Sequence, residues 1–109
     1  MKKLENFQAA QGWFLDKDNE VGPLTMAFRR GNTVSAPKHY HCSTHEYYLV
    51  LRGHATLEVN GDEIVLHPNS LVIVEPREIH CVNNASEDFE VIQVMEEYVP
   101  DDKILVADE

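Results

Sequence analysis

The chain has only two cysteines, Cys42 and Cys81, and no long hydrophobic run. Two cysteines without a C-x-x-C spacing are too few for a disulfide framework, so we expect two reduced thiols. No apolar stretch is long enough for a signal peptide or a membrane span. We therefore expect a cytoplasmic protein that has no membrane partner.

Basic residues are also scarce. Nine lysines and arginines stand against 19 acidic residues, which gives a formal net charge of -10. Nucleic acids and anionic membranes are bound mainly through lysine and arginine, so neither is expected as the main partner. The excess of acids is expected to keep a small protein soluble.

Helical periodicity is nearly missing as well. Residues 1–11 are the best helix candidate, and they equally suit a frayed terminus. The rest of the chain reads as short extended segments bounded by Gly, Pro, Asn or Asp. Strands are expected at residues 13–16, 23–30, 45–53, 54–60, 62–67, 70–75, 80–85 and 87–97. Short strands at regular spacing are typical of a β-sandwich or barrel, and 109 residues suit one domain.

The clearest local signal is a hairpin at residues 54–67. Asn60 and Gly61 stand between two alternating runs, and this pair tolerates the positive φ angles of a type I′ turn. Leu57 and Val59 are expected to share one face of the first strand.

Polar residues with metal-binding chemistry crowd the stretch "KHYHCSTHE". His39 and His41 are two apart, so both side chains point to one face of an extended strand. A further ligand can come from His45, Glu46 or the distant His80. A straight strand would turn residue 45 toward the metal, whereas a turn at "CST" would slip the phase and turn Glu46 inward. The residue pattern leaves both arrangements open.

Two segments resemble the motifs of the cupin superfamily. The first runs over residues 31–53 and contains His39, His41 and Glu46 at the spacing of the family's first motif. The second runs over residues 69–84, where Pro76 and His80 match the family's proline and metal-binding histidine, and Asn84 its trailing asparagine.

The chain departs from the family pattern at its turns. Gly31 stands two positions further from the first histidine than is usual. The glycine that usually opens the second motif is Asn69, and the acid after it is Ser70. The Pro-Gly pair of that motif reads Pro76-Arg77. None of these changes affects a ligand position.

The resemblance implies an all-β fold, a double-stranded β-helix or jelly-roll barrel. It places residues 1–109 in a single cupin domain, with flanking segments at 1–12 and 100–109. The metal ligands that it implies are His39, His41, Glu46 and His80, with His45 near the site or facing solvent. Mixed nitrogen and oxygen ligation suits one divalent transition metal, namely Fe, Mn, Ni, Zn, Co or Cu.

The same resemblance implies a metal-dependent enzyme that acts on an organic acid, a sugar or an aromatic diol. Oxygenation, decarboxylation and isomerisation are all expected on this scaffold, which alone does not choose among them. The candidate catalytic residues are Tyr48, Arg29 and Glu46. Arg29 and Arg30 lie on opposite faces of one strand, so only one of them is expected to face a ligand. The alternative function is a non-catalytic module that binds or senses a small ligand.

A homodimer is the expected assembly. Small cupins pair through edge strands, and Trp13, Phe14 and Leu15 offer an apolar patch near the start of the chain. Residues 96–109, which Pro100 interrupts, are expected to form an edge strand followed by a tail.

Overall fold

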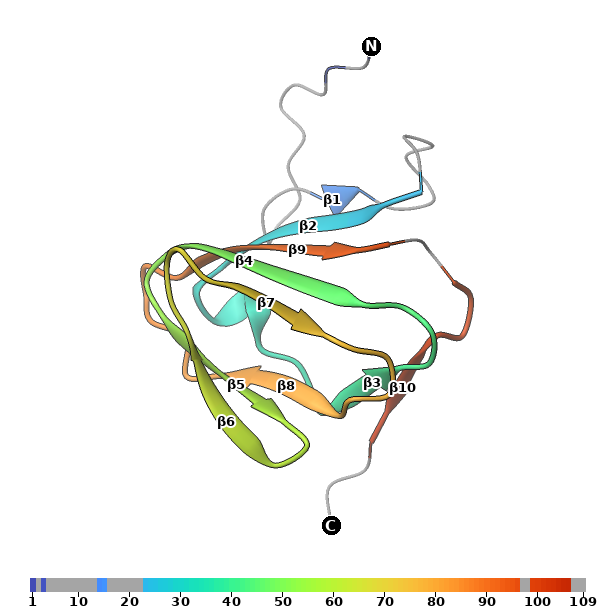
Figure 1. Ribbon diagram of the computed structural model, residues 1–109. Coiled ribbons are helices and arrows are strands. Elements are labelled where there is room, and N and C mark those ends of the chain that lie inside the picture. The colour runs from blue at the N-terminus through green and yellow to red at the C-terminus, as the bar shows by residue number, and fades with distance from the viewer. Residues whose placement is uncertain (2, 4–13, 16–22, 97–98, 107–109) are drawn as a thin grey trace.

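Two antiparallel five-stranded sheets face each other in the computed structural model (Figure 1). The structure describes residues 1, 3, 14–15, 23–96 and 99–106. The strands are β1 (Phe14–Leu15), β2 (Thr25–Arg30), β3 (His39–His41), β4 (Glu46–Arg52), β5 (Ala55–Val59), β6 (Asp62–Leu66), β7 (Leu71–Val74), β8 (His80–Asn83), β9 (Glu90–Met95) and β10 (Lys103–Leu105). One sheet has the order β1-β2-β9-β4-β7 and the other β10-β3-β8-β5-β6. The predicted all-β barrel is thereby confirmed.

The predicted hairpin is confirmed as β5 and β6. Asn60 has φ +50° and Gly61 has φ +89°, which are the two positive angles that the turn requires. Leu57 is fully buried, whereas its partner Ile64 on β6 is partly exposed. The hairpin therefore contributes its β5 face to the core.

The hydrophobic core lies between the two sheets. Its buried members are Val34, Tyr48, Val50, Ala55, Leu57, Leu66, Val74, Val82, Phe89 and Val91. Side-chain alternation along β4 explains which of its residues are buried, because Glu46, Tyr48 and Val50 point inward while Leu49 and Leu51 are exposed. The inward row of β4 thus begins with a carboxylate and continues into the apolar core.

Several segments differ from the expected strand pattern. Residues 31–34 form a short 3-10 helix, which was not predicted. The last long strand begins only at Glu90, because Phe89 N–H donates to the carbonyl of Ser86 in a turn. The helix candidate at residues 1–11 lies almost wholly outside the described residues. No helix among the residues that the structure describes is long and apolar enough to cross a membrane.

The two turn positions without their usual glycine keep a left-handed backbone. Asn69 has φ +69° and Arg77 has φ +71°. Asparagine tolerates this region well, whereas a long side chain such as that of Arg77 adopts it at some cost. The N–H of Arg77 donates to the carbonyl of His41 at 2.7 Å, and this hydrogen bond ties the turn to β3.

The chain ends named for dimerisation are only partly described. Trp13 lies outside the described residues, and Phe14–Leu15 form β1 at the edge of one sheet. The edge strand expected within residues 96–109 is β10, which pairs with β3. Dimer formation itself stays a prediction.

Gly53 and Gly61 allow a matched test of packing against backbone strain. Both have positive φ, but a Cβ on Gly53 would lie 2.5 Å from Ser86 Oγ and 2.8 Å from Phe89 Cα, whereas none of the described atoms lies within 4 Å of a Cβ on Gly61. We expect Gly61→Ala to lower the free energy of unfolding by about 1–2 kcal/mol through strain alone. Gly53→Ala adds the cost of overpacking and should lose about 2–4 kcal/mol in urea unfolding. Equal losses in the two variants would contradict this packing argument.

Candidate metal centre

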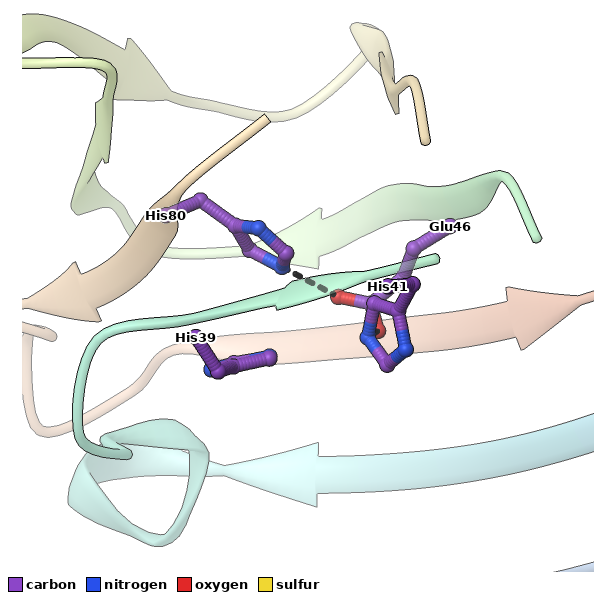
Figure 2. A group of neighbouring side chains, drawn as sticks. All are labelled: His39, His41, Glu46 and His80. Atoms are coloured by element: carbon purple, nitrogen blue, oxygen red, sulfur yellow. Dashed lines mark ion pairs between the residues drawn. The ribbon is translucent and has the colours of Figure 1, made fainter. Parts of the chain in front are cut away.

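Both sheets contribute to one cluster of ionisable side chains. His39 and His41 come from β3, His80 lies opposite His39 on β8, and Glu46 opens β4 of the other sheet. All four are buried, and one ligand atom from each lies within 4.8 Å of the others. Figure 2 shows the four side chains converging on a common point between the sheets. This cluster can hold one metal ion.

A bend after β3 brings Glu46 to the same side as the histidines. The chain bends at residues 42–43, where Ser43 is exposed. After the bend Thr44 is buried, and Glu46 faces inward with Tyr48. The chain therefore makes the phase slip that the residue pattern had left open. His45 faces the other way, is partly exposed and forms an ion pair with Glu96.

Each imidazole of the cluster has an acceptor at its Nδ1 atom. The partner is the Pro37 carbonyl for His39 at 2.8 Å, the Glu78 carbonyl for His80 at 2.8 Å, and Asp102 Oδ2 for His41 at 3.1 Å. Carbonyl and carboxylate oxygens only accept, so Nδ1 is the nitrogen that keeps the proton when each of these rings is neutral. The Nε2 atoms are left as lone-pair donors, which is the form that binds a metal.

The Nε2 atoms of His41 and His80 face a carboxylate that is also an acceptor. His41 Nε2 lies 3.3 Å from Glu46 Oε2, and His80 Nε2 lies 3.5 Å from Glu46 Oε1, the contact drawn in Figure 2. His41 Nε2, His80 Nε2 and Glu46 Oε1 are buried and have no hydrogen-bond partner in the part of the chain that the structure describes. Acceptors gathered in this way require a proton or a metal ion between them.

The charges of the cluster follow from its burial and contacts. Burial alone would raise the pKa of Glu46, but its contacts with His41, His80 and Tyr48 outweigh burial and hold that pKa well below the usual range. Burial lowers the pKa of His39 to about 4, so this ring is neutral at pH 7. Burial would lower the pKa of His41 too, but the two carboxylates beside it, Glu46 and Asp102, raise it. The cluster therefore attracts positive charge.

Asp102 is the residue of this region that sequence reasoning missed. It is 6% exposed and stands just before β10, about sixty residues from the bend that it holds. Its Oδ1 accepts hydrogen bonds from the N–H and the hydroxyl of Ser43, and its Oδ2 accepts from Thr44 Oγ1 and His41 Nδ1. Its carbonyl also accepts from the N–H of Cys42. No sequence motif marks this residue, because β10 reaches the bend only through its pairing with β3.

A cavity of about 350 Å³ lies beside the cluster. It is lined by residues Thr25, Ala27, Arg29, Thr33, Val34, Ser35, Ala36, His39, His41, Glu46, Tyr48, Val82, Gln93, Met95 and Lys103. Of the two neighbouring arginines, Arg29 lines this cavity, whereas Arg30 is exposed, pairs with Glu90 at 3.6 Å and lies over the Phe28 ring. Of the two arginines, Arg29 is therefore the one that faces the cavity.

Tyr48 belongs to both the core and the cavity wall. Its side chain is 1% exposed, and burial followed by the charge of Glu46 raises its pKa well above the usual value. The hydroxyl therefore stays protonated and contacts Glu46 as a donor. Cys42 and Cys81 are free thiols, as predicted, and neither belongs to the cluster.

Asp102→Asn tests the hydrogen bonds that hold the bend. An amide retains one acceptor oxygen and presents an NH₂ group to donors, so at least one buried donor loses its partner. We expect the free energy of unfolding, measured in urea, to fall by about 2–4 kcal/mol. The matched control is Asp101→Asn, because Asp101 is exposed and asparagine also accepts its φ of +59°. A similar loss in the two variants would show that the buried carboxylate does not hold the bend.

Comparisons with known proteins agree with this architecture. The model of the cupin domain family matches residues 29–95. A crystal structure from Planctomyces limnophilus is 21% identical with a TM-score of 0.64, and covers 94% of this chain and 96% of its own. A cupin protein from Bacteroides fragilis is 15% identical with a TM-score of 0.66, and covers 98% of this chain and 100% of its own.

An enzyme is also among the similar structures. PAC13 from Streptomyces, solved with uridine, is 17% identical with a TM-score of 0.67, and covers 97% of this chain and 92% of its own. A second structure, of Pac13, is of a protein called a unique nucleoside dehydratase; it is 17% identical with a TM-score of 0.62, and covers 77% of this chain and 68% of its own. Comparison with curated proteins gives no match. At these identities the structural likeness shows the fold alone. Because the family match spans more than half of the chain, and the two-sheet barrel agrees with it, the protein belongs to the cupin domain family.

Proposed function

We propose that this cupin binds one divalent transition metal and acts on a small molecule in the adjoining cavity. The proposed ligands are His39, His41, Glu46 and His80. The observation that carries the proposal is that His41 Nε2, His80 Nε2 and Glu46 Oε1 meet at one buried point without a hydrogen-bond partner among the described residues. Each of the three imidazoles has Nδ1 committed to an acceptor, and the Nε2 atoms of His41 and His80 lie against the Glu46 carboxylate. A metal ion bound there relieves the repulsion among these lone pairs.

The donor set narrows the choice of metal. Three neutral imidazoles and one carboxylate supply a single negative charge, so a divalent ion keeps a net positive charge. Nitrogen donors favour Fe, Mn, Co, Ni, Cu or Zn and disfavour Ca or Mg. No thiolate belongs to the cluster, which argues against a structural zinc site of the cysteine type.

The chain's own residues suit chemistry on a bound organic molecule. When bound, the metal supplies a Lewis acid that polarises a carbonyl or carboxylate oxygen. The neutral Tyr48 hydroxyl lies against Glu46, where it orients that carboxylate and can donate a hydrogen bond at the cavity wall. Val34, Val82 and Met95 form apolar parts of the same wall and reduce the access of water.

An enzyme is the function that this arrangement supports best. Oxygenation, decarboxylation and isomerisation remain the reaction classes proposed from the family, and PAC13 shows that a barrel of this shape accommodates dehydration. The cavity that joins the cluster is what favours catalysis over a purely structural ion, because a structural site needs no space for a ligand.

Metal content of single-histidine variants tests the ligand set. We expect elemental analysis of protein purified without chelator to find about one metal ion per chain in the wild type. His41→Ala and His80→Ala each remove a ligand and should lower this content sharply. His45→Ala is the matched control from the same stretch, because His45 points toward Glu96 and should leave the content unchanged. Full metal content in His41→Ala and His80→Ala would refute the assignment.

Turnover separates the enzyme from a binding module. Metal-loaded protein is offered small organic acids, sugars and aromatic diols, and product is followed by mass spectrometry. We expect metal-dependent product from one of these classes, and none from His80→Ala. If a compound binds to the loaded protein and is recovered unchanged in every case, the non-catalytic module is the better description.

A further inference from the structure

We propose that the cavity takes a small monocarboxylate and that the Arg29 guanidinium binds its carboxylate group. This inference names the ligand class of the site proposed above and rests on that function for the other end of the ligand. It follows from the placement of Arg29, from the charges of the wall and from the size of the cavity.

Strand alternation and one hydrogen bond place Arg29. Thr25, Ala27 and Arg29 are every second residue of β2, and all three line the cavity. The Nε atom of Arg29 donates to Gln93 Oε1 at 3.2 Å, and Gln93 lies on the neighbouring strand β9. This contact orients the planar guanidinium at the wall that also carries Glu46. Arg29 is near enough to Glu46 to interact with its charge.

The charges of the wall favour an anion. Among the described residues that line the cavity, Glu46 is the only acidic one, although the whole chain has a net charge of -10. Arg29 and Lys103 supply two positive charges, and a divalent ion on the cluster more than neutralises Glu46. A bound metal therefore leaves a cationic cavity inside an acidic protein, and this contrast selects a negatively charged ligand.

Size and shape narrow the anion to a small carboxylate. A volume of about 350 Å³ is near the lower end of the range for ligand pockets. Val34, Val82 and Met95 suit a short apolar body, and a single guanidinium matches the two coplanar oxygens of a carboxylate. A ligand of this kind can place its carboxylate at Arg29 and its other end toward the histidines.

Lactate is a suitable probe, with lactamide as its uncharged counterpart. The protein is loaded with zinc, which is diamagnetic, and each probe is titrated while the backbone and arginine Nε–H resonances are followed by NMR. We expect lactate to shift the Arg29 Nε–H resonance and to bind at least about tenfold more tightly than lactamide. Methyl phosphate is titrated in parallel, and tighter binding of methyl phosphate than of lactate would overturn the carboxylate assignment.

Variants of the two neighbouring arginines form a matched pair. Arg29→Gln should weaken lactate binding by about tenfold or more and leave the zinc content, measured by elemental analysis, unchanged. Arg30→Gln removes an exposed charge from the other face of β2 and should leave lactate binding unchanged. Arg29→Lys keeps the charge but lacks the planar guanidinium, so its affinity for lactate should lie between those of the Arg29→Gln and Arg30→Gln variants. This variant also keeps the test valid if Arg29→Gln fails to fold. Unchanged lactate binding in both Arg29 variants would overturn the inference.

A metal-free arm separates this inference from the proposed function. Glu46→Gln removes the negative charge opposite Arg29 without changing the shape of the side chain, and it is titrated with lactate in the absence of metal. Loss of lactate binding on adding Arg29→Gln in this background supports the carboxylate subsite even if the wild type binds no zinc. No effect of Arg29→Gln in either arm refutes the subsite even if zinc binds as proposed.

Discussion

The carboxylate of Asp102 holds the bend between β3 and β4, and the orientation of the β4 side chains follows from that bend. Its two oxygens accept from Ser43, Thr44 and His41. Without the bend, strict alternation from His41 would turn His45 inward and Glu46 outward. The same carboxylate fixes the proton on Nδ1 of His41. One buried charge from the end of the chain therefore sets both the direction of Glu46 and the tautomer of a neighbouring histidine.

The polar cluster occupies the ends of strands whose remaining inward residues are apolar. Glu46 precedes Tyr48 on β4, and His80 precedes Val82 on β8, so the core begins one pleat away from the cluster. Close packing there fixes the backbone of both strands, and the Nδ1 contacts fix the rotation of the imidazole rings. The rigid barrel thus presents lone pairs to one point, while the open side of the cluster leads into the cavity.

Local patterns were sufficient for much of the fold. The Asn60-Gly61 turn, the inward position of Leu57 and the shared face of His39 and His41 depend on two-residue periodicity and turn chemistry, which act over a few residues. The residues at Asn69 and Arg77 depart from the family's glycines, yet both positions have a left-handed backbone. The strand that begins at Glu90 was predicted to begin at residue 87, because the Ser86 turn has no strong sequence signal.

The sequence by itself determined the β-rich character, the hairpin, and the two histidines that share a face, since each depends on neighbours in the chain. The resemblance to cupins added Glu46 and His80 to the expected metal ligands. Only the tertiary structure decided the phase of Glu46, the choice of Arg29 over Arg30 as the cavity residue, and the role of Asp102. These depend on contacts between segments as far apart as β3 and β10, and side-chain periodicity carries no information about which distant strand supplies the partner.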